Sequence, residues 1–211
     1  MTFSRRTAVL ALAAAAIAPA ALAQGALVPE DQALVDKATA YLQNLEEARG
    51  RFVQTDARGQ MSEGTFFLKR PGKARFEYDP PSGLVVVSDG AAVTVADSRL
   101  NTFNRYPLGA TPLSLFLAKT IRLDKGVAIT GVERQGASFT ILARDGHRKT
   151  AGQLALTFTE TPLRLTNWAV TDAQGRTTRV RLIGLERTAG LDKALFTPVD
   201  PRRRAAPHAA M

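Results

Sequence analysis

Two histidines and a few carboxylates are the side chains of this sequence that could take part in catalysis. His147 follows the turn sequence Asp145-Gly146, and His208 lies in a tail rich in proline, arginine and alanine. A Ser-His-Asp triad would need His147 to leave its turn, and the sequence has no Gly-x-Ser-x-Gly elbow to supply a nucleophile. Cysteine is absent, and histidines and acidic residues do not cluster as metal ligands do, so we expect no metal, no cofactor and no disulfide.

Three carboxylates, Glu63, Glu77 and Asp79, could in principle work as an acid and base pair. Their simpler roles are structural, because Glu77 alternates outward with Arg75 and Asp79 begins the turn that continues into two prolines. Glycine motifs that cradle phosphate are also missing. We therefore expect a protein that is not an enzyme.

The most informative segment runs from Gly64 to Pro81 and predicts two apolar strands joined by a turn. Alternation places Phe66 and Leu68 on one face of the first strand and Phe67 on the other, so both faces carry a phenylalanine. Such a strand is covered on its second face by helices, lines a pocket, or packs in an ordinary core. The pattern indicates a surface for holding a partner and offers no catalytic group.

Arg70 ends the apolar face of that first strand. A guanidinium there is costly unless carbonyls or a carboxylate accept its hydrogen bonds, whereas many arginines at strand ends reach water instead. The residues alone leave both possibilities open.

The N-terminus has the three parts of an export signal. Arg5 and Arg6 form the charged start, an apolar stretch follows, and Ala21-Leu22-Ala23 is a small-x-small cleavage site. The apolar stretch is too short to span a bilayer. We expect residues 1–23 to be removed, by the general or the twin-arginine export route, and 24–198 to form one domain, followed by a disordered basic tail over 199–211.

The mature chain remains basic. Without Arg5 and Arg6, 26 of the 28 Lys and Arg residues remain against 19 acidic residues, a net charge of about +7. Nucleic acid is an unsuitable partner for an exported protein, and attraction to anionic lipid head groups or general solubility accounts for the charge.

The periodicity predicts a mainly β protein. An amphipathic helix is expected over Pro29 to Glu47, ended at Gly50, and a short apolar helix over Leu113 to Leu117. Eleven short strands are expected between turn signals, and a last helical turn over Leu191 to Phe196. The predicted strands are 51–55, 64–70, 73–78, 84–88, 91–96, 102–106, 127–132, 138–143, 153–158, 163–171 and 177–185. A sheet of about eleven strands curls, and this leaves a concavity that helices cover.

The order and spacing of several of these segments resemble one family. The segments are Gly50 to Thr55, Gly64 to Lys73, Phe76 to Pro81, Val87 to Gly90, and Arg105 to Pro107 with Thr111 to Leu113. Together they resemble the periplasmic outer-membrane lipoprotein carriers of the LolA family. The resemblance implies an open antiparallel half-barrel, LolA/LolB-like, with two or three short helices as a lid over a hydrophobic cavity.

The resemblance also implies a function and partners. A monomer in the periplasm would take triacylated lipoproteins from an inner-membrane ABC transporter of the LolCDE type and deliver them to an outer-membrane acceptor, or to the outer membrane directly. The family's arginine at the place of Arg70 holds the lid shut. Some members carry an aromatic residue four positions later, tied to handover, where this chain has Ala74.

The candidate residues for the cavity and lid are apolar or aromatic side chains of the predicted strands and helices. They are Phe52, Phe66, Leu68, Phe76, Tyr78, Leu113, Phe116, Trp168, Leu34, Leu42 and Leu45. Two other functions remain as alternatives: a related half-barrel that senses lipoproteins or lipids as an envelope regulator, and an envelope hydrolase. The first would normally carry a second domain, and the second lacks a nucleophile.

Overall fold

The computed structural model describes residues 27–111, 113–121, 127–145 and 152–202. The predicted export signal, both histidines and the last nine residues of the predicted tail lie outside these ranges. None of the helices in the described ranges combines the length and the apolarity that a membrane crossing requires.

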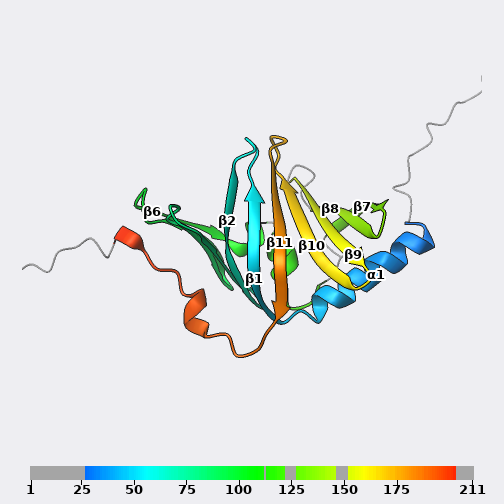
Figure 1. Cartoon of the computed structure of the whole chain (residues 1–211), viewed down its shortest axis with the longest axis horizontal. Coiled ribbons are helices and arrows are strands. Elements are labelled where there is room, and N and C mark those ends of the chain that lie inside the picture. Colours follow the sequence, from blue (N-terminus) through cyan, green and yellow to red (C-terminus); the bar gives the residue numbers. More distant parts are fainter. Residues whose placement is uncertain (1–26, 112, 122–126, 146–151, 203–211) are drawn as a thin grey trace, which may run out of the picture.

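One antiparallel sheet of eleven strands makes up most of the described chain (Figure 1). Its order is β6-β5-β4-β3-β2-β1-β11-β10-β9-β8-β7, so the first and last strands of the chain pair at the centre, and β6 and β7 form open edges. The strands are β1 (Glu47–Thr55), β2 (Met61–Lys69), β3 (Lys73–Tyr78), β4 (Leu84–Asp89), β5 (Ala92–Asp97), β6 (Thr102–Pro107), β7 (Val127–Gln135), β8 (Ser138–Asp145), β9 (Gln153–Glu160), β10 (Leu163–Thr171) and β11 (Thr177–Arg187). The predicted mainly β fold with an open antiparallel sheet is confirmed.

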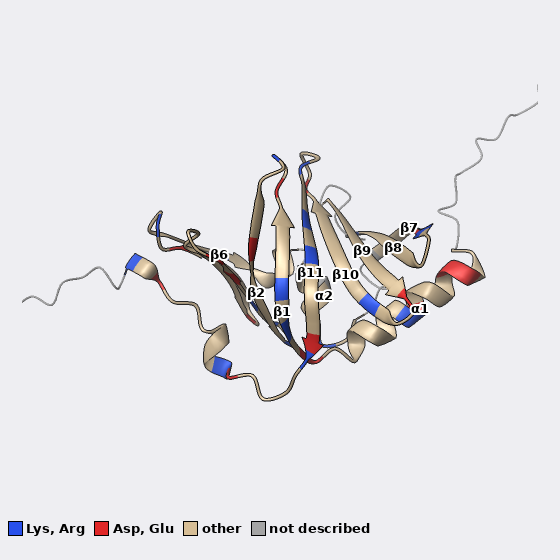
Figure 2. Ribbon diagram, viewed as in Figure 1, with Lys and Arg blue, Asp and Glu red and all other residues tan. Residues whose placement is uncertain are grey.

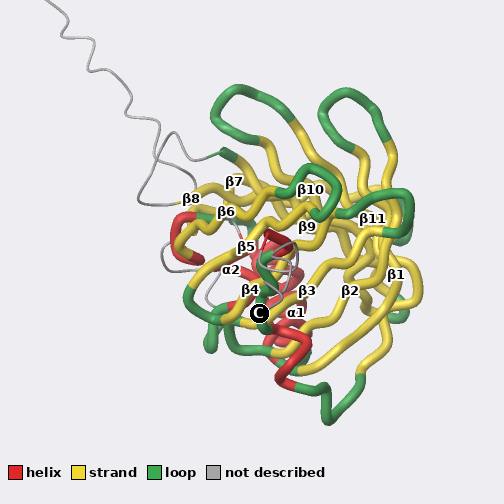
Figure 3. Tube along the Cα trace, turned by 90° about the vertical axis from the view of Figure 1, so that its left-hand side faces the viewer, coloured by secondary structure: helices red, strands yellow, loops and turns green. Residues whose placement is uncertain are grey.

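Helices α1 (Pro29–Gln43) and α2 (Leu113–Leu117) lie on the inner side of the curved sheet, which we call the concave face (Figure 3). Buried residues of α1 pack with Phe139, Ile141 and Phe158 of β8 and β9. Leu117 of α2 packs with Leu68 and Ala74 of β2 and β3. Each helix therefore covers a different half of the sheet.

The predicted end of the first helix is wrong. The helix stops at Gln43, and the chain turns at Asn44 and enters β1 at Glu47. Gly50, predicted as the helix stop, lies inside β1, where it pairs with Phe66 of β2 and stands at a register shift in the pairing with β11.

The chain after β11 lies on the opposite, convex face. The backbone N–H of Leu191 donates to Glu47 Oε2 at 2.8 Å, and Arg75 donates to the carbonyl of Leu195 at 3.0 Å. The predicted last helical turn is the 3-10 helix η2 (Lys193–Phe196), whose Phe196 is buried there. It contacts β3 and β4 from outside, so it does not belong to the predicted lid. A short 3-10 turn, η1 (Leu108–Ala110), precedes α2.

Candidate binding cavity

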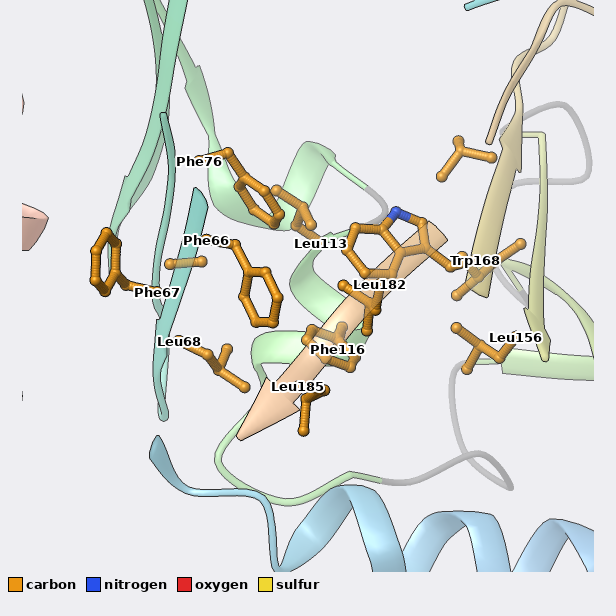
Figure 4. A pocket seen from close by; sticks show the side chains of 13 residues that line it. Phe66, Phe67, Leu68, Phe76, Leu113, Phe116, Leu156, Trp168, Leu182 and Leu185 are labelled. Carbon is orange, nitrogen blue, oxygen red and sulfur yellow. The ribbon is translucent and has the colours of Figure 1, made fainter. Parts of the chain in front are cut away.

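An apolar cavity of about 120 Å³ lies between the concave face and α2. Side chains from both halves of the sheet converge on it, and Phe67 is the exception because its ring lies on the far side of β2 (Figure 4). The lining residues are Phe66, Phe67, Leu68, Ala74, Phe76, Leu113, Phe116, Leu154, Leu156, Trp168, Val170, Leu182 and Leu185. None of them carries a charge, so the cavity can hold hydrocarbon and cannot stabilise an ion.

Aromatic rings form a continuous cluster along one wall. Phe76 lies 6.2 Å from Phe66 and 6.0 Å from Trp168 between ring centroids, and Trp168 stacks on Phe116 of α2 at 6.2 Å. At these spacings the faces and edges of aromatic rings attract one another, and this attraction adds to the stabilisation from burying the rings. The cluster therefore connects the first half of the sheet, the second half and α2.

Two glycines allow the rings to lie flat against the sheet. A Cβ at Gly50 would lie 2.8 Å from the Phe66 ring, and a Cβ at Gly64 would lie 2.7 Å from the Phe52 ring and 2.1 Å from the carbonyl of Glu77. These contacts are too close for any side chain. Gly50 and Gly64, two of the glycines in the segments that carry the family resemblance, therefore make room for aromatic rings.

The cavity contains six of the eleven predicted cavity and lid residues, namely Phe66, Leu68, Phe76, Leu113, Phe116 and Trp168. The other five are not part of its lining. Phe52 is 1 % exposed and packs behind it with Phe66, and Tyr78 packs on Phe52. Leu34 and Leu42 belong to the core between α1 and β8–β10, and Leu45 packs against Leu68 and Leu117.

Apart from Trp168, sequence reasoning missed the lining residues of the second half of the sheet. These are Leu154, Leu156, Val170, Leu182 and Leu185. The period-2 spacing of Leu154, Leu156 and Phe158 already placed them on one face. Nothing in the spacing says that this face opposes β2 and β3, because that depends on the β1–β11 pairing.

Arg70 lies directly after β2, beside the end of α1 and the segment after α2. Its guanidinium donates to the carbonyls of Leu42 and Ala118, the second at 2.5 Å, and more weakly to those of Gln43 and Lys119 at 3.4 and 3.5 Å. The last turn of α1 has no basic residue of its own, so Arg70 supplies the positive charge that favours a helix C-terminus.

Burial lowers the pKa of the Arg70 guanidinium, and the charge of Glu46 acts in the opposite direction. Its Nε is buried without a hydrogen-bond partner in the described part of the chain. Gln43 reinforces the same junction, because its amide donates to the carbonyl of Lys119 at 3.1 Å and accepts from the backbone of Ile121 at 2.8 Å. The two helices are thus joined through polar contacts at this one junction.

Two of the three carboxylates considered for catalysis lie beside the same arginine, and the third does not. Asp79 accepts a hydrogen bond from Arg51, which lowers the pKa of its carboxyl group, and Glu63 lies 3.7 Å from that arginine. Glu77 pairs with Arg75. Within the described ranges, no group of histidine and acidic residues could hold a metal ion.

The chain is similar to several known proteins. Residues 43–199 match the family model described as outer membrane lipoprotein carrier protein LolA. The outer-membrane lipoprotein carrier protein of Cupriavidus taiwanensis is 26% identical over 87% of this chain and 92% of its own. That of Leptothrix cholodnii is 30% identical over 76% of this chain and 79% of its own. The crystal structure of the LolA superfamily protein NE2245 from Nitrosomonas europaea aligns over 80% of this chain and 97% of that one, with 10% identity and a TM-score of 0.48.

Proposed function

Because this chain belongs to the LolA family of outer-membrane lipoprotein carriers, we propose that it carries lipoproteins across the periplasm with their acyl chains in the apolar cavity. The lipoproteins would come from an inner-membrane ABC transporter of the LolCDE type and go to the outer membrane. The observation that carries the proposal is a cavity between sheet and α2 whose lining has no charged side chain.

The size of the cavity implies that it enlarges on loading. On the measure that applies to this volume, one water needs about 10–15 Å³ and a methylene group is of similar size, so about 120 Å³ has room for about ten methylene groups. Three long acyl chains need several times that volume. We therefore infer that the cavity enlarges, by movement of α2, when a triacylated cargo enters.

Release needs no fuel if the fit is only partial. Burying a methylene group is worth about 0.8 kcal/mol, so three long chains in water would be penalised by some tens of kcal/mol, beyond the roughly 18–21 kcal/mol at which affinities saturate. A carrier whose binding free energy equalled this whole penalty could not release its cargo. A cavity that closes on itself when empty holds chains against water but not against a bilayer.

Arg70 is proposed as the latch of the lid, that is, the group that joins the end of α1 to the segment after α2 in the closed state. Its carbonyl acceptors belong to both helical segments, so separating them breaks its hydrogen bonds. Forming these bonds again favours closure and drives cargo out.

Delivery to the membrane without an acceptor lipoprotein is proposed for the last step. Ala74 lines the cavity where some family members have an aromatic residue tied to handover. Basic residues are spread along β1 and β11 (Figure 2), and the mature chain, with 26 Lys and Arg against 19 acidic residues and a net charge of about +7, is attracted to anionic lipid surfaces.

The test is release of lipoproteins from membranes. Membranes that hold the transporter are incubated with ATP and the mature chain, and we expect lipoproteins in a soluble one-to-one complex. Val170→Phe, which reduces the cavity, should abolish release, and Thr157→Val, on a strand face away from the cavity, should not. Binding of lipoproteins without their release would instead favour the sensor, and activity in lipase or esterase assays would favour the hydrolase.

A further inference from the structure

The segment after α2, from Ala118 to Ile121, joins the lid to α1, and we call it the connector. It has no helix or strand, so its backbone N–H and C=O groups need partners from elsewhere. Just before it, the carbonyl of Leu117 accepts a hydrogen bond from the backbone N–H of Gly72 at 2.8 Å. At its end, Ile121 is 3 % exposed and packs in the core with α1. The connector therefore holds α2 between the sheet and α1.

Gln43, the last residue of α1, pairs with the connector through both ends of its carboxamide. Its Nε2 donates to the carbonyl of Lys119 at 3.1 Å, and its Oε1 accepts from the backbone N–H of Ile121 at 2.8 Å. The opposite orientation of the amide would place two acceptors together and two donors together, so these contacts fix how the group is turned. One side chain thus takes the place of the neighbouring strand that this backbone lacks.

Arg70 cannot supply both of these contacts. A guanidinium has donors only, so it cannot accept from the N–H of Ile121, and it reaches the Lys119 carbonyl only at 3.5 Å. Its short bond to the connector goes to the neighbouring carbonyl of Ala118. The two side chains therefore hold the connector from different elements, because Arg70 ties it to the end of β2 and Gln43 ties it to α1.

The amide of Gln43 makes these contacts only while the connector lies against α1. Gln43 is an exposed residue, so water hydrates its amide whenever the connector moves away. Gln32 on the same helix differs, because its amide donates to Asp36 within α1 at 2.8 Å. Movement of the connector therefore breaks the hydrogen bonds of Gln43 and leaves that of Gln32 in place.

We propose that Gln43 is a positioning residue of the lid, which clamps the connector to α1 and thereby sets how often α2 leaves the sheet. The inference rests on the proposed function, because it concerns the lid over the acyl-chain cavity. The sign of its effect differs from that of a merely structural role. Structural damage weakens binding of an acyl lipid, whereas loss of a clamp that acts only in the closed state strengthens binding and slows release.

The test is Gln43→Met, which keeps the length of the side chain and removes the amide. A fluorescent acyl lipid is titrated into the mature variant, and the loaded protein is then mixed with vesicles to follow release. We expect the dissociation constant to fall about fivefold and release to slow by about the same factor, as the loss of two hydrogen bonds between uncharged groups allows. Exchange of the Gly72 amide, which α2 protects through Leu117, should become about fivefold faster by NMR, because it follows the open fraction.

The matched control is Gln32→Met, the same substitution on the same helix, which should leave lipid binding, release and Gly72 exchange unchanged. Gln43→Asn keeps the amide on a shorter side chain that cannot make both contacts, so it should behave like Gln43→Met and replaces it if that variant does not fold. Weaker or unchanged lipid binding by the Gln43 variants, or unchanged exchange of Gly72, would overturn the clamp. In that case the carrier function stands, provided that the wild type binds lipid and releases lipoproteins from membranes. If the wild type does neither, the carrier function fails together with the clamp.

Discussion

Replacing Arg70 by leucine should increase the affinity for acyl chains and slow their release. The guanidinium makes two short hydrogen bonds, to Leu42 and Ala118, and two long ones. Hydrogen bonds to charged groups contribute about 1.5–3 kcal/mol each, and the cost of burying the guanidinium offsets part of this. We take about 1.5–3 kcal/mol as the net stabilisation of the closed state.

A ligand that binds only the open state loses affinity in proportion to how rarely that state is populated. Removing 1.5–3 kcal/mol from the closed state therefore lowers the dissociation constant about 10- to 140-fold. Loading should remain intact, and cargo should stay on the variant. Arg70→Lys keeps the charge but not the forked geometry of the guanidinium. Its dissociation constant should therefore lie between those of the wild type and Arg70→Leu.

The assay measures both steps. A fluorescent acyl lipid is titrated to obtain the dissociation constant, and the loaded protein is then mixed with vesicles to follow release. Arg105→Leu is the charge-matched control, because Arg105 pairs with Asp89 on the exposed edge of the sheet, 2.7 Å away. Arg70→Leu with weaker binding, or with release as fast as the wild type, would refute the latch.

Three further predictions concern the glycine contacts, the cavity and the convex face. Gly64→Ala should lower the free energy of unfolding in urea by at least about 2 kcal/mol, because the new Cβ would meet a carbonyl and a ring, whereas Gly109→Ala, with open space around it, should change it by less than about 0.5 kcal/mol. Val170→Phe should weaken binding of an acyl lipid at least fivefold while the protein stays folded, and unchanged binding would mean that the lipid lies elsewhere. Hydrogen bonds from Lys69 and the backbone N–H of Leu191 lower the pKa of Glu47, so the stability they provide is present above the unfolded-state pKa of about 4.3 and is lost as pH falls through the lower folded-state value. Hydrogen exchange of the segment after β11 should therefore accelerate below about pH 4 in the wild type but be pH-independent, apart from intrinsic rates, in Glu47→Gln.

The hydrophobic periodicity and the turn residues of the sequence were sufficient to predict most helices and strands of this fold. Strand β3 and helix α2 have the predicted bounds, because turn residues delimit both. The first helix was predicted too long because Leu45 continues its apolar stripe, yet Leu45 is buried against Leu68, in the turn before β1. A residue that would face the core both in a longer helix and in the turn before β1 does not indicate where the helix ends. The pairing of β1 with its neighbouring strands determines the end of the helix.

The site was predictable only in part, for a related reason. Alternation identifies Phe66, Leu68 and Phe76 as one face, and the cavity uses it. Phe52 has the same alternation but is sealed behind the cavity, because Gly64 lets its ring lie flat on the neighbouring strand. Whether an inward side chain lines a cavity or fills the wall depends on its neighbours across strands, which spacing along one strand cannot reveal.

The packing of the two helices indicates which of them opens. Four residues of α1 are buried, and Arg134 of β7 pairs with Asp31 at its start at 2.9 Å, so moving this helix would expose a large part of the core. Helix α2 has five residues, too few for independent stability, and among its residues with described side chains only Leu117 is fully buried. The rings of Phe116 and Trp168 meet face to face across the cavity wall, and an acyl chain could take the place of this contact. Displacing α2 breaks the bonds of Arg70 to the segment after it but no hydrogen bond between strands. The sheet can therefore stay intact while the cavity changes volume.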